Sequence, residues 1–378
     1  MSAKILNSYN SSRYNKTILL EKRWTIPDYT KFSNSYKPQQ YSPILQKYLP
    51  WIYNFNTRVA AFRDQVDKDR RKFEKRYISL NIHRSSIIED ALNQLRNINE
   101  AHYKWRHCFK ISFINEHGLS EAGIDQNGVF KEFMETLMTK LFSADFGLFK
   151  WTGVADDDDN GDCERCCYPS SLSYLHENHL ELFKFAGQML AKALYEGLVL
   201  DIPLAVFLLR HLLPKSGSAT NIYSILDDLP LLDPILYKNL DQVRKIDNVE
   251  DLCLSFCFEE NHMGQLKQFE LFPGGKNIDV TNTNRIQYIH KFVNYKFNVQ
   301  LKNQIKALET GFHTIIPKWL LQSFASPREL SRLMSGDSLS MDIDVDDLRK
   351  NIKYFGGFHS SHKVINWLFD VLKNDFKG

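Results

Sequence analysis

The chain has 378 residues, which is long enough for two or three domains and a large buried core. Its hydrophobic fraction of 43% is that of a globular protein, and its 48 basic and 45 acidic residues nearly cancel, so the composition favours neither nucleic acid nor a membrane surface as a partner. The sequence holds no apolar run of about 18 residues and no secretory-type apolar segment at its start, so we expect no membrane span. Six cysteines in so long a chain are typical of free thiols in a reducing compartment, and we expect a cytoplasmic protein, with the nucleus as the alternative.

The first part of the chain begins with a polar stretch and then becomes helical. Residues 1–45 are rich in Asn, Ser and Tyr and contain three prolines, which predicts a loose or peripheral segment. A helical pattern follows over 45–76, and residues 77–82 predict a short strand. The densest basic run, KDRRKFEKR at 68–76, alternates with acidic residues, and we interpret it as a solvated helix face.

Two short elements lead into the most clearly patterned helix of the chain. Residues 85–97 predict a short helix with an N-cap serine, and residues 109–114 alternate as a half-buried strand does. After a glycine-containing loop, we expect Asp125 to cap an amphipathic helix that runs to Phe142. Its apolar residues come in adjacent pairs four positions apart: Val129 and Phe130, Phe133 and Met134, Leu137 and Met138, Leu141 and Phe142. Such a wide apolar stripe must be covered by other helices, so we expect it to lie in a helical core.

An acidic segment at 156–167, DDDDNGDCERCC, predicts a surface loop. Its Cys163, Cys166 and Cys167 have a spacing found among zinc ligands. A closed structural zinc site needs four ligands, however, and no second CxxC or HxxxH lies at a suitable distance along the chain. We therefore expect no metal site and no cofactor.

Most of the remaining sequence is helical in pattern. Residues 202–213 are apolar on nearly all sides and should be buried, and Ser326–Pro327 with Glu329 form a capping box that predicts a helix start. Further helical patterns cover 176–200, 281–311, 344–352 and 361–376.

One region combines a helix start with a strand pattern. Asp233 and Pro234 predict a capped helix with proline at its first position, and the helix carries an apolar face of Leu236, Leu240 and Val243. Residues 252–258, LCLSFCF, alternate strictly and predict a strand that pairs with a second one near 265–272. The predicted fold class is α+β, mostly α, with one small antiparallel sheet.

Catalytic motifs with a local signature are missing from the sequence: there is no P-loop, no GxGxxG after a strand, no HExxH and no GxSxG. Six separated blocks carry a resemblance instead. They are GIDQNGVFKEF from Gly123, YPSSLSYLHENHLELFKFAGQMLAKALYEGLVLDIP from Tyr168, LDDLPLLDPILYKNL from Leu226, PGGKNIDVTNTNRIQYIH from Pro273, GFHTIIPKWLLQSF from Gly311 and IDVDDLRKNIKYFGGFHSSHKVINWLFDVL from Ile343. In this order they closely resemble the HECT domain of ubiquitin-protein ligases, nearest to the subgroup whose longer members carry an IQ motif. The resemblance covers about residues 96–378.

The resemblance implies an N-terminal lobe that docks a ubiquitin-charged conjugating enzyme. Residues 1–95 would be an N-terminal extension, partly helical. The lobe would comprise a large helical subdomain (96–192 and 288–378) and a small α/β subdomain (193–287). In the family, a further C-terminal lobe carries the cysteine that accepts ubiquitin before it passes to a substrate lysine.

That catalytic cysteine lies in a stretch like T-x-x-T-C-F/M-N, and none of the six cysteines here has this context. The sequence ends before such a lobe, so we assign no catalytic residue. The alternative function is a non-catalytic lobe that binds conjugating enzymes or acts as a scaffold. The implied partners are a conjugating enzyme, ubiquitin and protein substrates.

In the family, the conjugating enzyme inserts a loop aromatic into an apolar groove of the small subdomain. Matched block by block, the groove positions here are Leu236, Asn239, Leu240, Ile246, Leu252, Leu254 and Tyr288. An apolar site with a polar rim is where an aromatic anchor gains most of its binding energy. The alternative is that several of these residues only fill the core between the predicted helix and strand.

Overall fold

The computed structural model describes residues 53–73, 76–96, 98, 102–115, 117–119, 121, 126–152, 165–214, 224–262, 264–324, 326–336, 345, 348–349, 352, 354 and 356–374. The predictions for residues 1–45, for the Asp125 cap, for Cys163 and for most of 344–352 lie outside the described residues.

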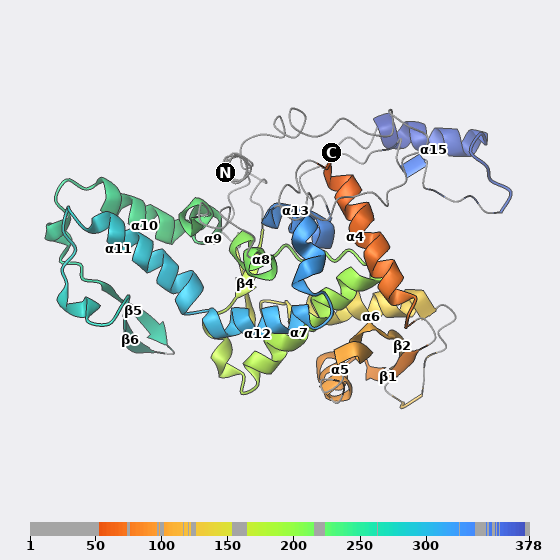
Figure 1. Ribbon diagram of the computed structural model, residues 1–378, viewed down its shortest axis with the longest axis horizontal. Helices are drawn as coiled ribbons and strands as arrows, with labels where there is room; N and C mark the ends of the chain where they lie inside the picture. The colour runs from red at the N-terminus through yellow and green to blue at the C-terminus, as the bar shows by residue number, and fades with distance from the viewer. Residues whose placement is uncertain are drawn as a thin grey trace.

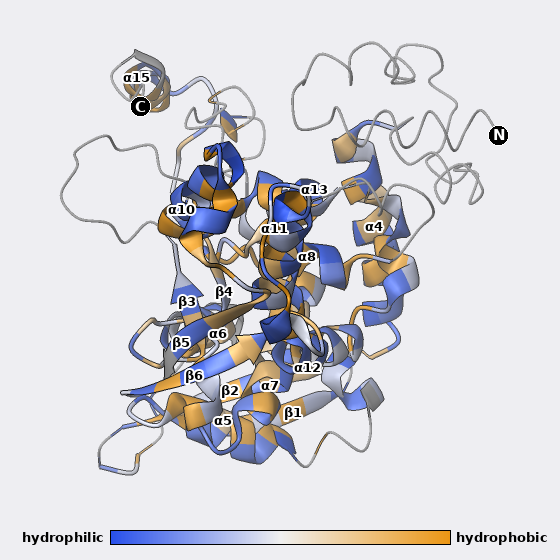
Figure 2. Ribbon diagram, turned by 90° about the vertical axis from the view of Figure 1, so that its left-hand side faces the viewer, coloured by the Kyte–Doolittle hydropathy of each residue, from blue (hydrophilic) through white to orange (hydrophobic). Residues whose placement is uncertain are grey.

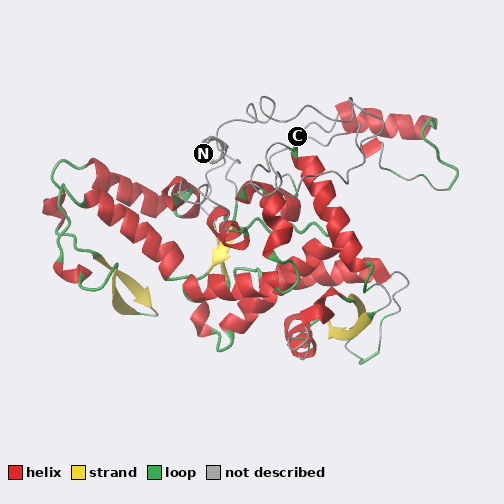
Figure 3. Ribbon diagram, in the orientation of Figure 1, coloured by secondary structure: helices red, strands yellow, loops and turns green. Residues whose placement is uncertain are grey.

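Helices dominate the described chain, and three two-stranded sheets accompany them (Figure 3). The helices are α4 (Phe55–Arg70), α5 (Ile87–Arg96), α6 (Gln126–Leu141), α7 (His179–Glu196), α8 (Val206–Leu212), α9 (Leu229–Leu232), α10 (Pro234–Lys245), α11 (Arg285–Asn294), α12 (Lys302–His313), α13 (Pro327–Ser335) and α15 (Lys363–Asn374). The strands are β1 (Tyr77–His83), β2 (Cys108–Ile114), β3 (Phe149–Trp151), β4 (Cys167–Pro169), β5 (Cys257–His262) and β6 (Gln265–Glu270). The predicted class, α+β and mostly α, is confirmed.

The centre of the molecule is the pair of helices α7 and α12, which pack side by side (Figure 1). Thirteen of the eighteen residues of α7 are buried. The backbones approach so closely because each helix has a glycine at the contact: a Cβ on Gly187 would overlap the Leu308 carbonyl oxygen, and one on Gly311 would overlap that of Lys184. Glycine is therefore required at both positions by space rather than by backbone angle.

Around this pair, the predicted stripe of α6 faces inward. Phe133, Leu137 and Leu141 are fully buried, whereas Glu132 and Lys140 lie on the exposed side. Figure 2 shows the same division on other helices, where apolar and polar residues alternate around α4 and α10. The predicted amphipathic helix that runs to Phe142 is confirmed for the described residues, as α6 with one buried face.

The two predicted N-terminal strands form, and they pair with each other in parallel, in a register that places Tyr77 opposite Cys108 and His83 opposite Ile114. Only an antiparallel sheet was expected from the sequence. A parallel pair needs a crossover, and α5 supplies it between the two strands. Residues 77–114 therefore form one β–α–β unit beside α6.

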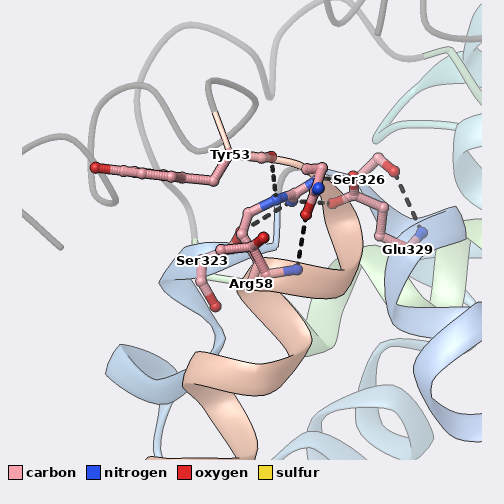
Figure 4. Close-up of polar contacts among 7 residues, drawn as sticks. Tyr53, Arg58, Ser323, Ser326 and Glu329 are labelled. Carbon is pink, nitrogen blue, oxygen red and sulfur yellow. Dashed lines mark hydrogen bonds and ion pairs between the residues drawn. The ribbon is translucent and has the colours of Figure 1, made fainter. Parts of the chain in front are cut away.

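The first described helix, α4, is anchored by a buried ion pair (Figure 4). Arg58, which is 1% exposed, donates from both terminal nitrogens to Glu329 on α13, at 2.7 and 2.5 Å. It also donates to the backbone oxygens of Tyr53 and Ser323, each at 3.0 Å. Ser326 accepts from the Glu329 amide at 3.3 Å, as the predicted cap of α13 requires.

The helical pattern over 281–311 does not form one helix. It is divided into α11 and α12 by a π-helical turn at Tyr295–Val299, closed by the bond from the Gln300 amide to the Tyr295 carbonyl. Phe297 of this turn is buried against Tyr168 and Phe207, with ring centroids 5.7 and 5.5 Å away. Beyond the turn, α10, α11, β5 and β6 form the left-hand end of the molecule in Figure 1.

Two local predictions are only partly correct. The predicted antiparallel pair forms as β5 and β6, but its first strand begins only at Cys257, because residues 249–252 form a 3₁₀ turn and Cys253 adopts a left-handed conformation with φ of 48°. The predicted surface loop at 156–167 does not extend to its last residues. Cys166 and Cys167 are buried, and Cys167 pairs with Trp151 in the β3–β4 ladder.

Candidate functional site

Helix α10 provides one side of the candidate docking site. It begins as predicted, since the Asp233 carboxylate accepts from the Leu236 amide at 2.9 Å and Pro234 occupies the first helical position. Leu236 and Leu240 then follow at a spacing of four and lie on one face, with Val243 one turn further. Helix α10 packs against α11. Because the cap fixes the residue at which α10 begins, it also fixes which side chains face α11.

The other sides of the site are tied to α10 by backbone and side-chain bonds. Arg285, at the start of α11, donates to the Ile246 carbonyl at 2.6 Å, just after α10 ends. Asn282 accepts from the Val249 amide at 3.3 Å, and the Val280 amide donates to the Leu254 carbonyl at 2.7 Å. The turn η8 (Val249–Leu252) and the segment after it are therefore held beside the first turn of α11.

The seven predicted positions lie in this one unit, at different depths. Leu240 and Tyr288 are buried, at 6% and 5% exposure. Three others are half-buried and pack against the core from its edge: Leu236, Ile246 and Leu254. Asn239 is exposed, and Leu252 is 42% exposed. Leu240 and Tyr288 thus belong to the hydrophobic core and are called the floor, whereas the exposed Asn239 and Leu252 are called the rim.

Tyr288 forms the aromatic part of that floor. Its ring meets Phe256 edge-to-face at 5.5 Å and Phe292 at 5.9 Å. Burial raises the pKa of the Tyr288 hydroxyl to about 12, so this group is neutral at physiological pH. Aromatic pairs of this geometry hold a ring in a fixed orientation.

Several exposed apolar side chains on the same elements were missed in the sequence. Ile235 on α10 is 73% exposed and Ile286 on α11 is 49% exposed, while Tyr237 and Ile278 are exposed to about the same degree as Leu252. The sequence signal that could have revealed them is their position one residue away from the buried stripe, on a helix flank. Large exposed apolar groups around a buried floor are typical of a surface that receives a protein partner.

The described cysteines do not form a reactive site. Burial raises the pKa of the Cys167 thiol far above its usual range, which makes it a poor nucleophile. Cys253 is exposed, and Cys257 is hydrogen-bonded with Ser255 at 3.0 Å. Within the described ranges, no three His, Cys, Asp or Glu side chains come together as metal ligands would.

No helix in the described part of the chain has both the length and the apolar character that crossing a bilayer requires.

Comparison with known proteins gives a consistent result. Residues 135–377 match the model of the HECT-domain (ubiquitin-transferase) family. The chain is 43% identical over 343 residues to the human protein "Ubiquitin-protein ligase E3B", and the match covers 88% of this chain and 30% of that protein. It is 38% identical over 331 residues to "E3 ubiquitin-protein ligase UPL6" of Arabidopsis thaliana, covering 86% of this chain and 30% of that protein.

A third relative, "E3 ubiquitin-protein ligase ptr1" of Schizosaccharomyces pombe, is 30% identical over 326 residues, and the match covers 86% of this chain and 9% of that protein. The chain thus spans less than a third of the length of these curated relatives. The family match covers well over half of the chain. The chain therefore belongs to the HECT-domain (ubiquitin-transferase) family.

Proposed function

We propose that this chain acts in HECT-type ubiquitin transfer as the lobe that docks a ubiquitin-charged conjugating enzyme. The observation that carries the proposal is the unit of α10, η8 and α11, in which a buried floor of Leu240 and Tyr288 is bordered by exposed Leu252. An aromatic or aliphatic anchor of a partner gains most of its binding energy where such a floor is covered and water is excluded.

The transfer reaction would proceed through thioesters. Ubiquitin passes from the conjugating enzyme's cysteine to a cysteine of the ligase and then to a lysine of the substrate, so each step exchanges one acyl bond for another. We assign no such cysteine to this chain, because none of the six lies in the family's T-x-x-T-C context. The role proposed for these residues is to hold the charged enzyme in place.

The internal division of the lobe is part of the proposal. Residues 193–287 would be the small docking subdomain, residues 96–192 and 288–378 the large one, and residues 1–95 an extension. The β5–β6 hairpin and α10 lie together at one end of the molecule, in agreement with a separate small subdomain (Figure 1). The ion pair of Arg58 and the β1–β2 pairing support the proposal that part of this extension packs on the lobe.

We also propose a cytoplasmic or nuclear location. The five cysteines that the structure describes are free thiols, which is usual for proteins of a reducing compartment.

The docking role can be tested by substituting one exposed residue of the rim. We expect Leu252→Asp to weaken binding of a conjugating enzyme by about 2 kcal/mol, or roughly thirtyfold in Kd, because it places a charge where the anchor is desolvated. Isothermal titration calorimetry with a panel of conjugating enzymes would measure this. Leu266→Asp is the matched control, since Leu266 is 71% exposed and lies at the turn of the β5–β6 hairpin. If no enzyme binds the wild type, or both variants bind equally well, the docking assignment is wrong.

The second candidate function is a scaffold that binds conjugating enzymes without transferring ubiquitin. A thioester-capture assay separates the two functions. A reducible ubiquitin adduct on this chain would contradict the absence of a transfer cysteine, whereas binding without an adduct agrees with a docking role.

A further inference from the structure

Two basic segments far apart in the sequence meet beside the start of β1. The first is the end of α4 and the residues after it, up to Arg76, and the second is the turn η4 (His102–Arg106). The Cys108 amide donates to the Arg76 carbonyl at 3.1 Å, and the His107 amide donates to the Lys104 carbonyl at 3.0 Å. These bonds fix the backbones of Arg76, Lys104 and His107 close to one another.

His107 lies in this junction with an unsatisfied ring nitrogen. The residue is 8% exposed, and its Nε2 is buried without a hydrogen-bond partner. The ring packs beside Phe73 and Tyr103, with centroids 5.6 and 5.8 Å away. A buried donor or acceptor without a partner costs free energy, so its presence calls for an explanation.

The charges around His107 are unbalanced. Burial lowers the pKa of His107, and the nearby cations Arg76, Lys192 and Lys104 lower it further. Lys192 is neutralised, because it donates to Glu196 at 2.5 Å as well as to the His107 carbonyl at 2.8 Å. Arg76 and Lys104, by contrast, have no carboxylate partner among the residues that the structure describes.

Two neighbouring basic residues are different in this respect. Arg106 pairs with Asp69 at 3.4 Å, and Arg70 reaches Glu196 at 3.7 Å. Among the residues that the structure describes, Arg76 and Lys104 are thus cations without a carboxylate partner, next to a buried imidazole whose Nε2 has no hydrogen-bond partner.

We propose that Arg76, Lys104 and His107 form a binding site for a phosphoryl dianion. A guanidinium fork, an ammonium and an imidazole N–H are the donor set that phosphate oxygens prefer, and two positive charges match a double negative charge. The neutral imidazole donates from Nε2 without adding a third charge. Nothing in this site takes part in the proposed docking of a conjugating enzyme, so the two proposals stand or fall separately.

The phosphoryl group could come from free phosphate or from a phosphorylated serine or threonine side chain, since both present the same oxygens. The test is an NMR titration of the His107 imidazole signals in histidine-labelled protein, at constant ionic strength. One arm adds inorganic phosphate, and the other adds a short peptide that carries one phosphoserine. We expect a saturable shift of His107 in both arms; a phosphopeptide affinity at least tenfold higher indicates a side-chain source, and equal affinities indicate the free anion.

The variants Arg76→Gln and Lys104→Gln should each weaken the binding about tenfold, because each removes a charged hydrogen-bond donor. Both side chains reach the surface, so neither change disturbs the core. Lys110→Gln is the matched control: it removes one positive charge from β2, where Lys110 lies over the Tyr77 ring at 4.6 Å, and it should leave the affinity unchanged. A shift that does not saturate, or equal affinities in wild type and all three variants, would show that only general screening occurs and would overturn the proposal.

Discussion

Replacing Gly311 by alanine is the most direct test of the packing at the centre of the molecule. A Cβ at this position would overlap the Lys184 carbonyl oxygen and lie 2.8 Å from the carbonyl carbon, against 3.4 Å or more in an ordinary contact. Both atoms belong to the backbone of α7, so no side chain can rotate away. The two helices would have to separate, and the loss would extend to the buried residues along α7.

The magnitude is the difference between two effects. Alanine is favoured over glycine in a helix interior by about 1 kcal/mol, which would stabilise the variant. Overpacking against rigid neighbours costs about 1–3 kcal/mol and occasionally more, and backbone against backbone belongs at the upper end of that range. We therefore expect Gly311→Ala to lower the free energy of unfolding by about 2 kcal/mol or more.

Urea denaturation followed by far-UV circular dichroism measures this change. The control is Gly128→Ala, because Gly128 lies in the first turn of α6 and is exposed, so only the gain in helix propensity applies. Gly187→Ala should behave like Gly311→Ala, since its Cβ would lie 2.9 Å from the Phe312 amide nitrogen. The double variant should lose less than the sum, because helices already separated by one methyl group accommodate the second. A Gly311→Ala protein as stable as the wild type would refute the reasoning.

Two further predictions concern groups buried at other sites. Arg58→Ala should cost about 3–5 kcal/mol of unfolding free energy, because it removes the Arg58 cation from the buried Glu329 carboxylate. The double variant Arg58→Met with Glu329→Leu should recover most of this loss, because it removes both charges. Equal losses in the single and the double variant, measured by urea denaturation, would contradict the buried pair. Burial raises the pKa of Tyr288 to about 12 in the folded chain, so the fold favours the neutral hydroxyl. The stability that follows from this shift is complete below pH 10, near the pKa of tyrosine in the unfolded chain, and is lost as the pH rises toward 12. The stability difference between wild type and Tyr288→Phe should therefore change only above pH 10, and a difference that is constant from pH 7 to 12 would show that Tyr288 ionises as an exposed tyrosine does.

The sequence predicted those features of helices and strands that are determined by residues close together along the chain. Asp233 and Pro234 fixed the start of α10, and the paired apolar residues of α6 identified its buried face. The strands β1 and β2 were recognised as well, but their parallel pairing depends on a crossover that residue patterns do not encode.

The misreadings have specific physical causes. The alternation in LCLSFCF is compatible with a strand, but the chain turns at Cys253, a residue type that rarely adopts a positive φ, so the turn had no signal. The long pattern at 281–311 contains no proline, and its only glycine lies at the C-terminal end, so the π-helical turn that divides it could not be located.

The docking site itself stays a prediction. Matching to the family predicted Leu240 and Tyr288, which are buried, and Leu252, which is 42% exposed. It did not predict exposed neighbours such as Ile235 and Ile286, because the family match names only the groove positions; their place beside the buried stripe of each helix is the signal that could have indicated them.

The anchoring of α4 has a practical consequence for anyone who expresses this lobe. The family match begins at residue 135, in the middle of α6, and leaves out the β1–α5–β2 unit together with the partner of Glu329. A recombinant fragment trimmed to that boundary would cut through the core helix α6, expose the apolar surfaces against which the missing elements pack, and remove the Arg58 cation that pairs with Glu329. Cloning should instead begin ahead of Tyr53, whose carbonyl receives the first bond from Arg58.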